Sequence, residues 1–288
     1  MRCCSLSDLS RRSLLFAGVA LTACVPKTAA TKDSPTTIDR AVAGAWRNPA
    51  DRVRDTWRHP SETLKFWGLQ PGATVVEFWP GAGWYTDVLA PFLAATGGKL
   101  YAADLQTDNS EDPAAGRIVT AYFRKLNAKP GLYGDVEITA FGPTSGPVAP
   151  PGRADLVLFL RNLHNWMAAG LAEKAFHDAF AALKRGGVLG VEEHRALPGG
   201  VPDLLAADGY VQQALVIQMG QEAGFTLAAT SEINANPRDT KDHPFGVWTL
   251  PPVRRSSPRG QPDDPTFNHA PYDAIGESDR MTLKFVKP

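Results

Sequence analysis

Val75-Val-Glu-Phe-Trp-Pro-Gly-Ala-Gly-Trp-Tyr-Thr86 is the stretch that decides the fold. The turn Pro71-Gly72 opens an apolar run, two glycines close it, and a helical pattern begins at Thr86. A strand, glycine turn and helix in this order form the ligand-binding unit of doubly wound folds. Glycine there lets the backbone approach a ligand, and the helix N-terminus offers free N–H groups. A tight turn without a ligand is the alternative interpretation.

Apolar runs and helical patterns alternate along the rest of the chain. They predict strands over 73–78, 99–104, 135–140, 154–160, 188–192, 225–232 and 281–286, and helices over 86–95, 113–129, 171–183 and 210–223. Strands alternating with helices at this spacing favour a parallel, doubly wound sheet. The long excursion before the final strand favours an antiparallel hairpin. We therefore expect an α/β fold with a Rossmann-like, mostly parallel seven-stranded sheet whose last strand is antiparallel.

The chain also carries segments outside this alternation. Residues 38–67 are expected to form helices ahead of the sheet, and the glycines within 184–187 are expected to end the helix at 171–183. An insertion over 234–279, rich in Pro, Asp and Arg, separates the last two strands. It could cap the crevice or be a solvated surface loop. The polar candidates on this insertion are Asp239, Asp242 and His243.

The first 23 residues predict an export signal. Three arginines precede an apolar run over 14–23, which is too short to span a bilayer and is typical of a secretory signal. Ser10-Arg-Arg-Ser-Leu-Leu15 resembles a twin-arginine signal, and Leu21-Thr-Ala-Cys24 resembles a lipobox. An ordinary secretory signal with a chance cysteine is the alternative.

A lipobox implies that Cys24 becomes the lipidated first residue of the mature protein. Residues 24–37 then form a tether, and residues 38–288 form the domain. We therefore expect an exported lipoprotein, attached to the membrane through Cys24 on the periplasmic side of the cell envelope.

Cysteine count and charge exclude several classes of protein. Cys3 and Cys4 are lost with the signal and Cys24 is acylated, so the mature body has no disulfide, thiolate metal ligand or cysteine nucleophile. Removing three of the 30 Lys and Arg and one of the 30 Asp and Glu with residues 1–23 leaves 27 against 29. This balance does not resemble the basic face of a nucleic-acid-binding protein.

Candidate polar residues follow three of the predicted strands. Asp104 stands about 20 residues after the glycines, where a carboxylate can accept both hydroxyls of a ribose. A helix N-cap or turn residue is the alternative. His164 follows the fourth strand and can take a proton from a nucleophile, unless it only satisfies loop backbone groups. Glu193 and His194 follow the fifth strand, as an acid/base pair or as part of a salt-bridged loop.

The histidines lack the spacing of a metal site. His59, His164, His194 and His243 come from separate loops, with no pair four residues apart on one helix. A site of two histidines and one carboxylate can form in three dimensions, but the spacing of these residues in the sequence does not indicate one. We assign no metal ligand from the sequence.

Several of these segments together resemble the class I S-adenosylmethionine-dependent methyltransferases. The resemblance rests on Glu77 with the glycine turn, on Asp104, and on the residues of the fourth and fifth strands, Ala154-Asp-Leu-Val-Leu and Leu183-Lys-Arg-Gly-Gly-Val-Leu-Gly190. The terminal strand fits the reversed hairpin of that family. One residue departs from the family pattern, because Trp79 stands where the family has glycine. Its ring could pack into the sheet or narrow the pocket.

A narrower resemblance joins further segments from about Arg40 to residue 288. They look like a bacterial group of predicted, exported methyltransferase-like proteins. The segments are Arg58-His-Pro, Pro80-Gly-Ala-Gly-Trp-Tyr-Thr86, Arg161-Asn-Leu-His-Asn-Trp166, Glu193-His-Arg195 and Gly246-Val-Trp-Thr-Leu-Pro-Pro252.

The resemblance implies roles for individual residues. Glu77, Gly81 and Gly83 would border the methionine part of S-adenosylmethionine, and Asp104 would hold its ribose. The other expected cofactor contacts are Tyr85 and Arg161, and the expected catalytic residues are His164, His194 and Asn162.

The leading functional hypothesis is methyl transfer from S-adenosylmethionine to an unknown small molecule in the cell envelope. Such transfer depends mainly on proximity and orientation. S-adenosylmethionine is made in the cytosol, however, so an exported chain also fits a non-catalytic small-ligand-binding protein on the same scaffold. A hydrolase or lyase that uses His164 and His194 is the third hypothesis, because a fold does not fix a function. The sequence gives no expectation for the oligomeric state.

Overall fold

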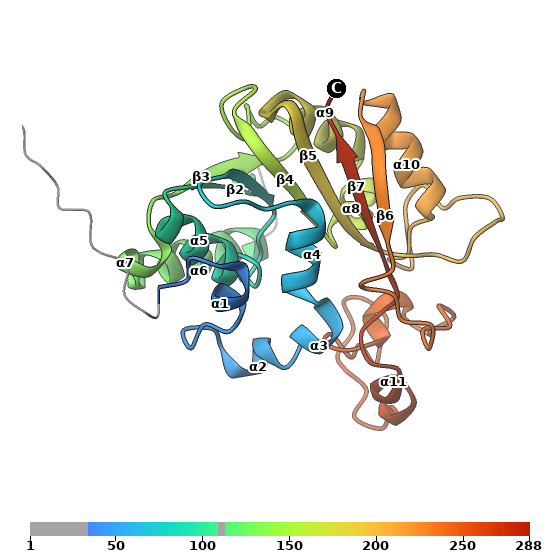
Figure 1. The fold of residues 1–288 in the computed structure, drawn as a ribbon. Coiled ribbons are helices and arrows are strands. Elements are labelled where there is room, and N and C mark those ends of the chain that lie inside the picture. Colours follow the sequence, from blue (N-terminus) through green and yellow to red (C-terminus); the bar gives the residue numbers. More distant parts are fainter. Residues whose placement is uncertain (1–33, 109–112) are drawn as a thin grey trace, which may run out of the picture. The chain divides into compact units, whose positions relative to one another are not determined.

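The computed structural model describes residues 34–108 and 113–288 (Figure 1). The predicted signal, the lipidation site Cys24 and the tether up to residue 33 lie outside the described residues. Thr37, at the end of the predicted tether, accepts a hydrogen bond from the backbone N–H of Arg40 and so caps the first described helix.

A seven-stranded sheet forms the centre of the fold. Its strands lie in the order β3-β2-β1-β4-β5-β7-β6. Six strands run parallel, and β7 runs antiparallel to both neighbours, β5 and β6. The predicted α/β class and the reversed last strand are therefore confirmed. The strands are β1 Thr74–Phe78, β2 Lys99–Leu105, β3 Val136–Phe141, β4 Ala154–Leu160, β5 Leu183–His194, β6 Thr226–Ser231 and β7 Arg280–Val286.

Helices cover both faces of the sheet (Figure 1). On one face pack α1 Ile38–Val42, α4 Pro60–Trp67, α5 Thr86–Thr96, α6 Pro113–Ala128 and α7 Pro130–Tyr133. On the other face pack α8 Leu163–Ala168, α9 Ala172–Ala182 and α10 Gln213–Glu222. The short helices α2 Pro49–Arg52 and α3 Asp55–Arg58 precede α4, and the predicted insertion contains η1 Gly246–Thr249 and α11 Ala270–Ile275.

The burial of the strands explains the order of the sheet. Almost every residue of β4 is buried, as expected for a central parallel strand that is covered on both faces. In the edge strand β6 exposed and half-buried residues alternate. Burial of apolar surface stabilises a fold by roughly 25 cal/mol per Å², so most of this stabilisation comes from the central strands of the sheet.

The reversal of strand order places the ligand crevice. β1 pairs with β2 on one side and with β4 on the other. The chain therefore continues from β1 toward one edge of the sheet, through β2 and β3, and then crosses back to the other side of β1 to form β4. Ligands of doubly wound sheets bind at this switch point, outside the carboxyl ends of the strands. The glycine turn and the loop after β4 both lie at that edge.

The helix boundary after α9 differs from the prediction. The helix ends at Ala182, and Leu183 already has extended backbone and pairs with Ala154 of β4. The N–H of Gly186 donates to the carbonyl of Lys287. Residues 184–187 therefore lengthen β5 with a bulge, and pairing with the neighbouring strands outweighs their resemblance to a helix C-cap.

None of the helices in residues 34–108 and 113–288 is long and apolar enough to cross a membrane.

Replacing Gly190 with alanine tests the packing between α4 and β5. A Cβ there would lie 2.5 Å from the ring of Trp67, whose indole N–H donates to the carbonyl of Leu283 and holds the ring in place. We expect Gly190→Ala to destabilise the fold by about 1–3 kcal/mol in urea unfolding, as overpacking does. In the control Gly116→Ala a Cβ meets nothing within 4 Å on helix α6, so stability should rise by about 0.5–1 kcal/mol. Equal effects of the two substitutions would contradict this account.

Candidate functional site

The glycine turn after β1 is fixed by its neighbours and open on one side. Gly81 and Gly83 both have positive φ, at 58° and 77°. A Cβ at Gly83 would lie 3.1 Å from Tyr122, whereas at Gly81 it would meet nothing within 4 Å. The Lys125 ammonium donates to the carbonyls of Ala82 and Gly83, at 2.8 and 3.1 Å. The space beside Gly81 is therefore available to a ligand while the turn keeps its shape.

The departure at Trp79 is resolved by its packing. The residue has left-handed backbone, at φ 44°, a conformation that glycine adopts without strain. Its indole N–H donates to the carbonyl of Phe141 at 3.0 Å, and its ring packs edge-on against Trp166. The side chain therefore packs against the sheet and the helices on its α8 face, the first of the two alternatives.

Glu77, at the carboxyl end of β1, is buried beneath the turn. The Thr86 hydroxyl donates to its Oε2 at 2.7 Å. Burial raises the pKa of Glu77 to about 7, because the carboxylate has lost most of its water. The residue therefore links the strand to the start of α5.

Asp104 occupies the equivalent position on β2. Its side chain is 1% exposed, and its Oδ1 accepts the backbone N–H of Leu105 at 2.8 Å. Its Oδ2 is buried and has no hydrogen-bond partner among the described residues. Burial raises the pKa of this carboxyl to about 6. An unpaired buried acceptor is costly, so this oxygen is suited to a donor that residues 34–108 and 113–288 do not supply.

Asn162 links the loop after β4 to the glycine turn. Its amide nitrogen donates to the carbonyls of Trp79 and Leu160, at 3.1 and 3.3 Å. These contacts suit a positioning role for this predicted catalytic residue. Arg161, beside it, donates to Glu192 at 3.0 Å.

The structure brings the two predicted catalytic histidines together. Their ring centroids are 5.2 Å apart. His164 Nδ1 lies 2.9 Å from Glu193 Oε1, so Glu193 pairs with His164, not with the His194 ring as the sequence suggested. The His194 ring instead contacts the Ser278 hydroxyl at 2.6 Å. Burial, then the nearby His164 and arginines, lowers the pKa of His194 well below its usual value, so its imidazole is neutral at pH 7.

A cavity of about 240 Å³ adjoins both histidines. Its walls come from four parts of the chain: the N-terminal helices, the loop after β4, the end of β5 and the insertion. Part of the insertion therefore lies over the site. Of the two alternatives for the insertion, a cap over the crevice and a solvated surface loop, this agrees with the first. The polar residues of the lining are Arg54, Arg58, Arg161, His164, Asn165, His194, Glu277 and Ser278, and Trp248 is its aromatic residue.

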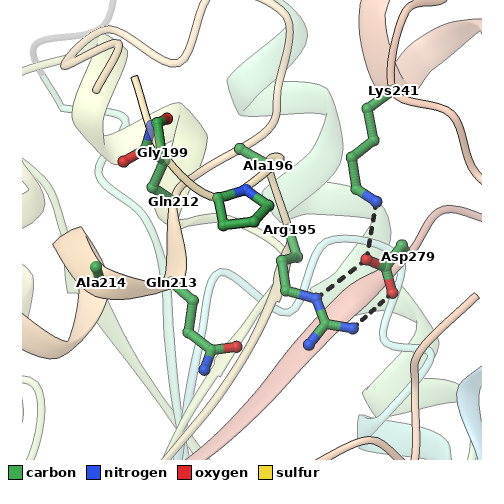
Figure 2. Close-up of a pocket in the computed structure, with 9 residues that line it drawn as sticks. Arg195, Ala196, Gly199, Gln212, Gln213, Ala214, Lys241 and Asp279 are labelled. Carbon is green, nitrogen blue, oxygen red and sulfur yellow. Dashed lines mark hydrogen bonds and ion pairs between the residues drawn. The ribbon is translucent and has the colours of Figure 1, made fainter. Parts of the chain in front are cut away.

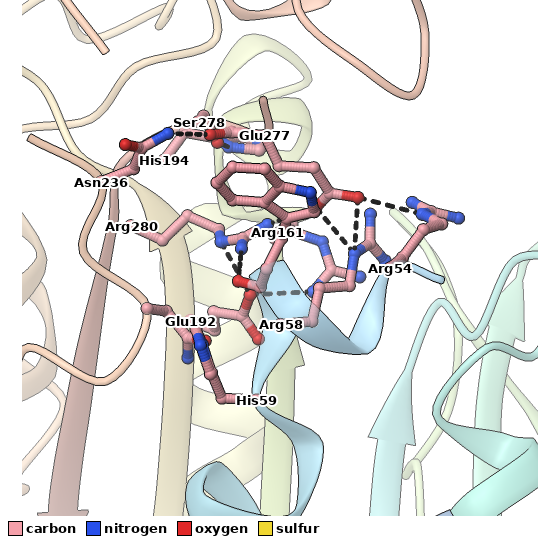
Figure 3. A network of polar contacts seen from close by, with 12 residues as sticks. Arg54, Arg58, His59, Arg161, Glu192, His194, Asn236, Glu277, Ser278 and Arg280 are labelled. Atoms are coloured by element: carbon pink, nitrogen blue, oxygen red, sulfur yellow. Dashed lines mark hydrogen bonds and ion pairs between the residues drawn. The ribbon is translucent and has the colours of Figure 1, made fainter. Parts of the chain in front are cut away.

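Four arginines around this cavity share two buried glutamates (Figure 3). Glu277 accepts from Arg54 at 3.0 Å and from Arg58 at 2.8 Å. Glu192 accepts from Arg161 at 3.0 Å, and Arg280 contacts both glutamates, at 3.1 and 2.6 Å. The network joins α3, β4, β5 and β7 at the edge where the site lies.

The predicted cofactor residue Tyr85 is part of the same network. Its hydroxyl donates to Glu192 at 3.2 Å, and the residue is buried. Burial first, and then the Glu192 charge, raises the pKa of Tyr85 well above its usual value, so it stays a neutral donor.

The three candidates on the insertion have different surroundings. Asp239 is buried and accepts from the Tyr210 hydroxyl, and His243 Nε2 lies 2.8 Å from one of its oxygens. Asp242 bonds the Thr240 hydroxyl at the surface. None of the three lines the 240 Å³ cavity. Asp239 and His243 instead hold the insertion in shape.

A second cavity, of about 390 Å³, lies beside the insertion (Figure 2). Its charged lining residues are already paired: Asp279 accepts from Arg195 at 2.9 Å and contacts Lys241 at 3.0 Å. Its lining contains none of the predicted site residues.

The arginine and glutamate network was not predicted from the sequence. Glu192 follows the run Val188-Leu-Gly-Val191 and Arg280 begins β7, and a charge beside a buried strand segment needs a partner, which was the available signal. The partners themselves are 219 to 223 positions apart for Arg58 and Arg54 with Glu277, a distance that no local pattern spans.

Solved structures with a similar fold include several methyltransferases. A SAM-dependent methyltransferase from Aquifex aeolicus is 22% identical, with a TM-score of 0.50 over 69% of this chain and 93% of that one. A putative sarcosine dimethylglycine methyltransferase from Galdieria sulphuraria is 14% identical, with a TM-score of 0.51 over 83% and 87% of the two chains. The [4+2]-cyclase SpnF is 16% identical, with a TM-score of 0.51 over 85% and 83%. No protein-family model and no curated protein matches the chain.

These structures and the strand order define the class of the fold. The chain has the class I S-adenosylmethionine-dependent methyltransferase fold, as its sequence predicted. At these identities the likeness concerns the fold, and the activity is argued from the site.

Replacing Glu277 with glutamine tests the charge network. Three guanidiniums would lose a carboxylate whose side chain is 4% exposed, and we expect a loss of about 3–5 kcal/mol in denaturant unfolding. The matched control is Glu232→Gln, which removes an ion pair from a side chain that is 66% exposed. It should cost less than about 1 kcal/mol. A loss at Glu277 no larger than that of the control would refute the proposed importance of the network.

Proposed function

We propose that this chain is an S-adenosylmethionine-dependent methyltransferase that acts on a small molecule. The observation that carries the proposal is the buried Asp104 Oδ2, which lacks a partner among the described residues at the carboxyl end of β2. A ribose hydroxyl is a donor of the required kind, and a ribose is what this position binds in related folds.

The neighbouring residues fit the rest of the cofactor. The open side of Gly81 admits a ligand close to the backbone. Glu77 would border the methionine end there, and Arg161 and Tyr85, the other expected cofactor contacts, both bond to Glu192. S-adenosylmethionine supplies an activated methyl group when bound, so the chain need only orient the acceptor and remove its proton.

His164, held by Glu193 and next to His194, is the residue suited to removing that proton. His164 and His194 both line the 240 Å³ cavity, which has room for a small molecule. Glu193 bonds the His164 ring and fixes its orientation, as a carboxylate does for a catalytic imidazole. Arg161 belongs both to the cavity lining and to the expected cofactor contacts, so the two sites adjoin.

We propose that the protein acts in the cell envelope, where the predicted lipidation of Cys24 would hold it on the periplasmic side. Supply of S-adenosylmethionine would limit catalysis there. A binding protein on the same scaffold therefore stays an alternative.

A second candidate function is a histidine-dependent hydrolase or lyase on this scaffold. The pairing of His164 with buried Glu193, beside His194, favours it, because such a pair can transfer protons without a methyl donor. The fold likeness to a [4+2]-cyclase is in keeping with chemistry of another kind on this scaffold.

Calorimetry with S-adenosylmethionine and S-adenosylhomocysteine tests the leading proposal. We expect micromolar binding of both, and a loss of at least about tenfold in affinity in Asp104→Asn, because the amide replaces a charged acceptor by a neutral one. The control Asp135→Asn removes an exposed carboxylate that pairs with Lys99, and it should bind like the wild type. Absence of binding of both ligands to the wild type would rule out the methyltransferase function.

The affinity should also depend on pH. The pKa of Asp104 is about 6 in the free protein, so its carboxyl is ionised above that pH and protonated below it. Binding that uses the ionised form should weaken by about tenfold between pH 7.5 and pH 5, since roughly one carboxyl in ten is then ionised. Calorimetry across this range should show a flatter profile for Asp104→Asn. Parallel profiles of the two proteins would show that Asp104 does not contact the ligand.

A further inference from the structure

We propose that His164, Glu193 and His194 form a binding site for a divalent transition-metal ion. Each residue offers one ligand atom, and the three atoms lie within 4.8 Å of one another. His164 Nδ1 and Glu193 Oε1 are 2.9 Å apart, close to the spacing of two ligands about 90° apart, as in octahedral coordination, around an ion about 2.1 Å from each. Two histidines and one carboxylate are a common donor set for zinc and for non-haem iron.

The framework of the sheet holds the three residues in place. His164 lies in the first turn of α8, directly after β4, and Glu193 and His194 end β5. β4 and β5 are paired in parallel up to Leu160 and Glu192, so their carboxyl ends meet. Ligands on neighbouring rigid elements need only small side-chain shifts to close around an ion.

The charge of Glu193 supports a cation at this place. Its side chain is fully buried, and its partners are the His164 ring and the backbone N–H groups of His164 and His194. The nearby Arg161 and Arg58 are engaged by Glu192 and Glu277. A buried carboxylate is costly unless it is well paired, and a bound ion would place a further positive charge beside it.

Contacts outside the cluster orient its ligands. Ser278 lies 2.6 Å from His194 Nδ1, which leaves Nε2 of that ring for an ion. Such outer contacts fix the ring and raise the affinity of metal sites.

The cavity gives the site a chemical use. Both histidines line it, so an ion held there would keep coordination positions open to water or a substrate. Three protein ligands and an open position are typical of catalytic metal sites, where the ion lowers the pKa of bound water. If an ion is bound, His164, Glu193 and His194 would hold it, and it would supply Lewis-acid activation of water in place of a free imidazole base. This proposal does not require S-adenosylmethionine binding and is tested without it.

The test is titration of the metal-free full chain, without a polyhistidine tag, with Co²⁺. We expect one ion per chain at this cluster and a visible absorption band of bound Co²⁺. Glu193→Gln and His194→Gln should each lose this ion or weaken its affinity at least about tenfold. All variants keep Cys3, Cys4 and Cys24, so ions on thiolates cancel in the comparison.

The matched control is His243→Gln, which breaks another buried pair of a histidine with a carboxylate, here Asp239. It should bind Co²⁺ like the wild type. Circular dichroism checks the folding of each variant, and if Glu193→Gln does not fold, the half-buried His194 still provides the test. The thermal midpoint of the wild type should rise with added Co²⁺. No Co²⁺ bound by the wild type, or equal binding by His194→Gln and the wild type, would overturn the proposal.

Discussion

The site is built around two buried carboxylates that four arginines share. Glu192 lies within the central strand β5 and contacts Arg161, Arg280 and the Tyr85 hydroxyl. Glu277 precedes β7 and contacts Arg280 and the arginines of the N-terminal helices. Each ion costs several kcal/mol to remove from water, and only well-formed pairs offset this cost. These contacts are therefore coupled, and the parts of the chain that carry them are fixed in relation to one another.

This coupling sets the chemistry of the cavity. Because Glu192 and Glu277 engage the arginines, they leave Glu193 to His164, next to His194. The glycine turn lies on the other side of the loop after β4, and the Asn162 amide connects the two. The cofactor crevice and the histidine cavity are thus neighbouring parts of one sheet edge, with Arg161 between them.

The sequence predicted the sheet well because its central strands are continuous apolar runs. Residues 154–160 form β4 with the predicted limits, and the reversed final strand follows from the long segment before it. The error at 184–187 has a local cause, since a Lys-Arg-Gly-Gly segment suits both a helix end and a bulged strand. Only the neighbouring strands decide between the two.

The sequence predicted which residues lie at the candidate site, but it did not predict which side chains contact one another there. Residues after β1, β2, β4 and β5 must meet at one edge, and this placed Asp104, His164 and His194 correctly at that edge. The partner of Glu193 depends on rotamers and on the competing arginines. The contact of Glu193 with the His164 ring, on which the proposed metal site depends, therefore emerged only from the structure.

The separation of Arg54 and Glu277 along the chain also affects when their contact can form during synthesis of the protein. The two residues are 223 positions apart, and a ribosome adds about 5–20 residues per second. Roughly 10 to 45 s therefore pass between the synthesis of the arginine and that of the carboxylate that holds it. During this interval the nascent chain can form the first strands, but the walls of the cavity are incomplete. The lining of the cavity is thus incomplete until Glu277 and Ser278 have been synthesised.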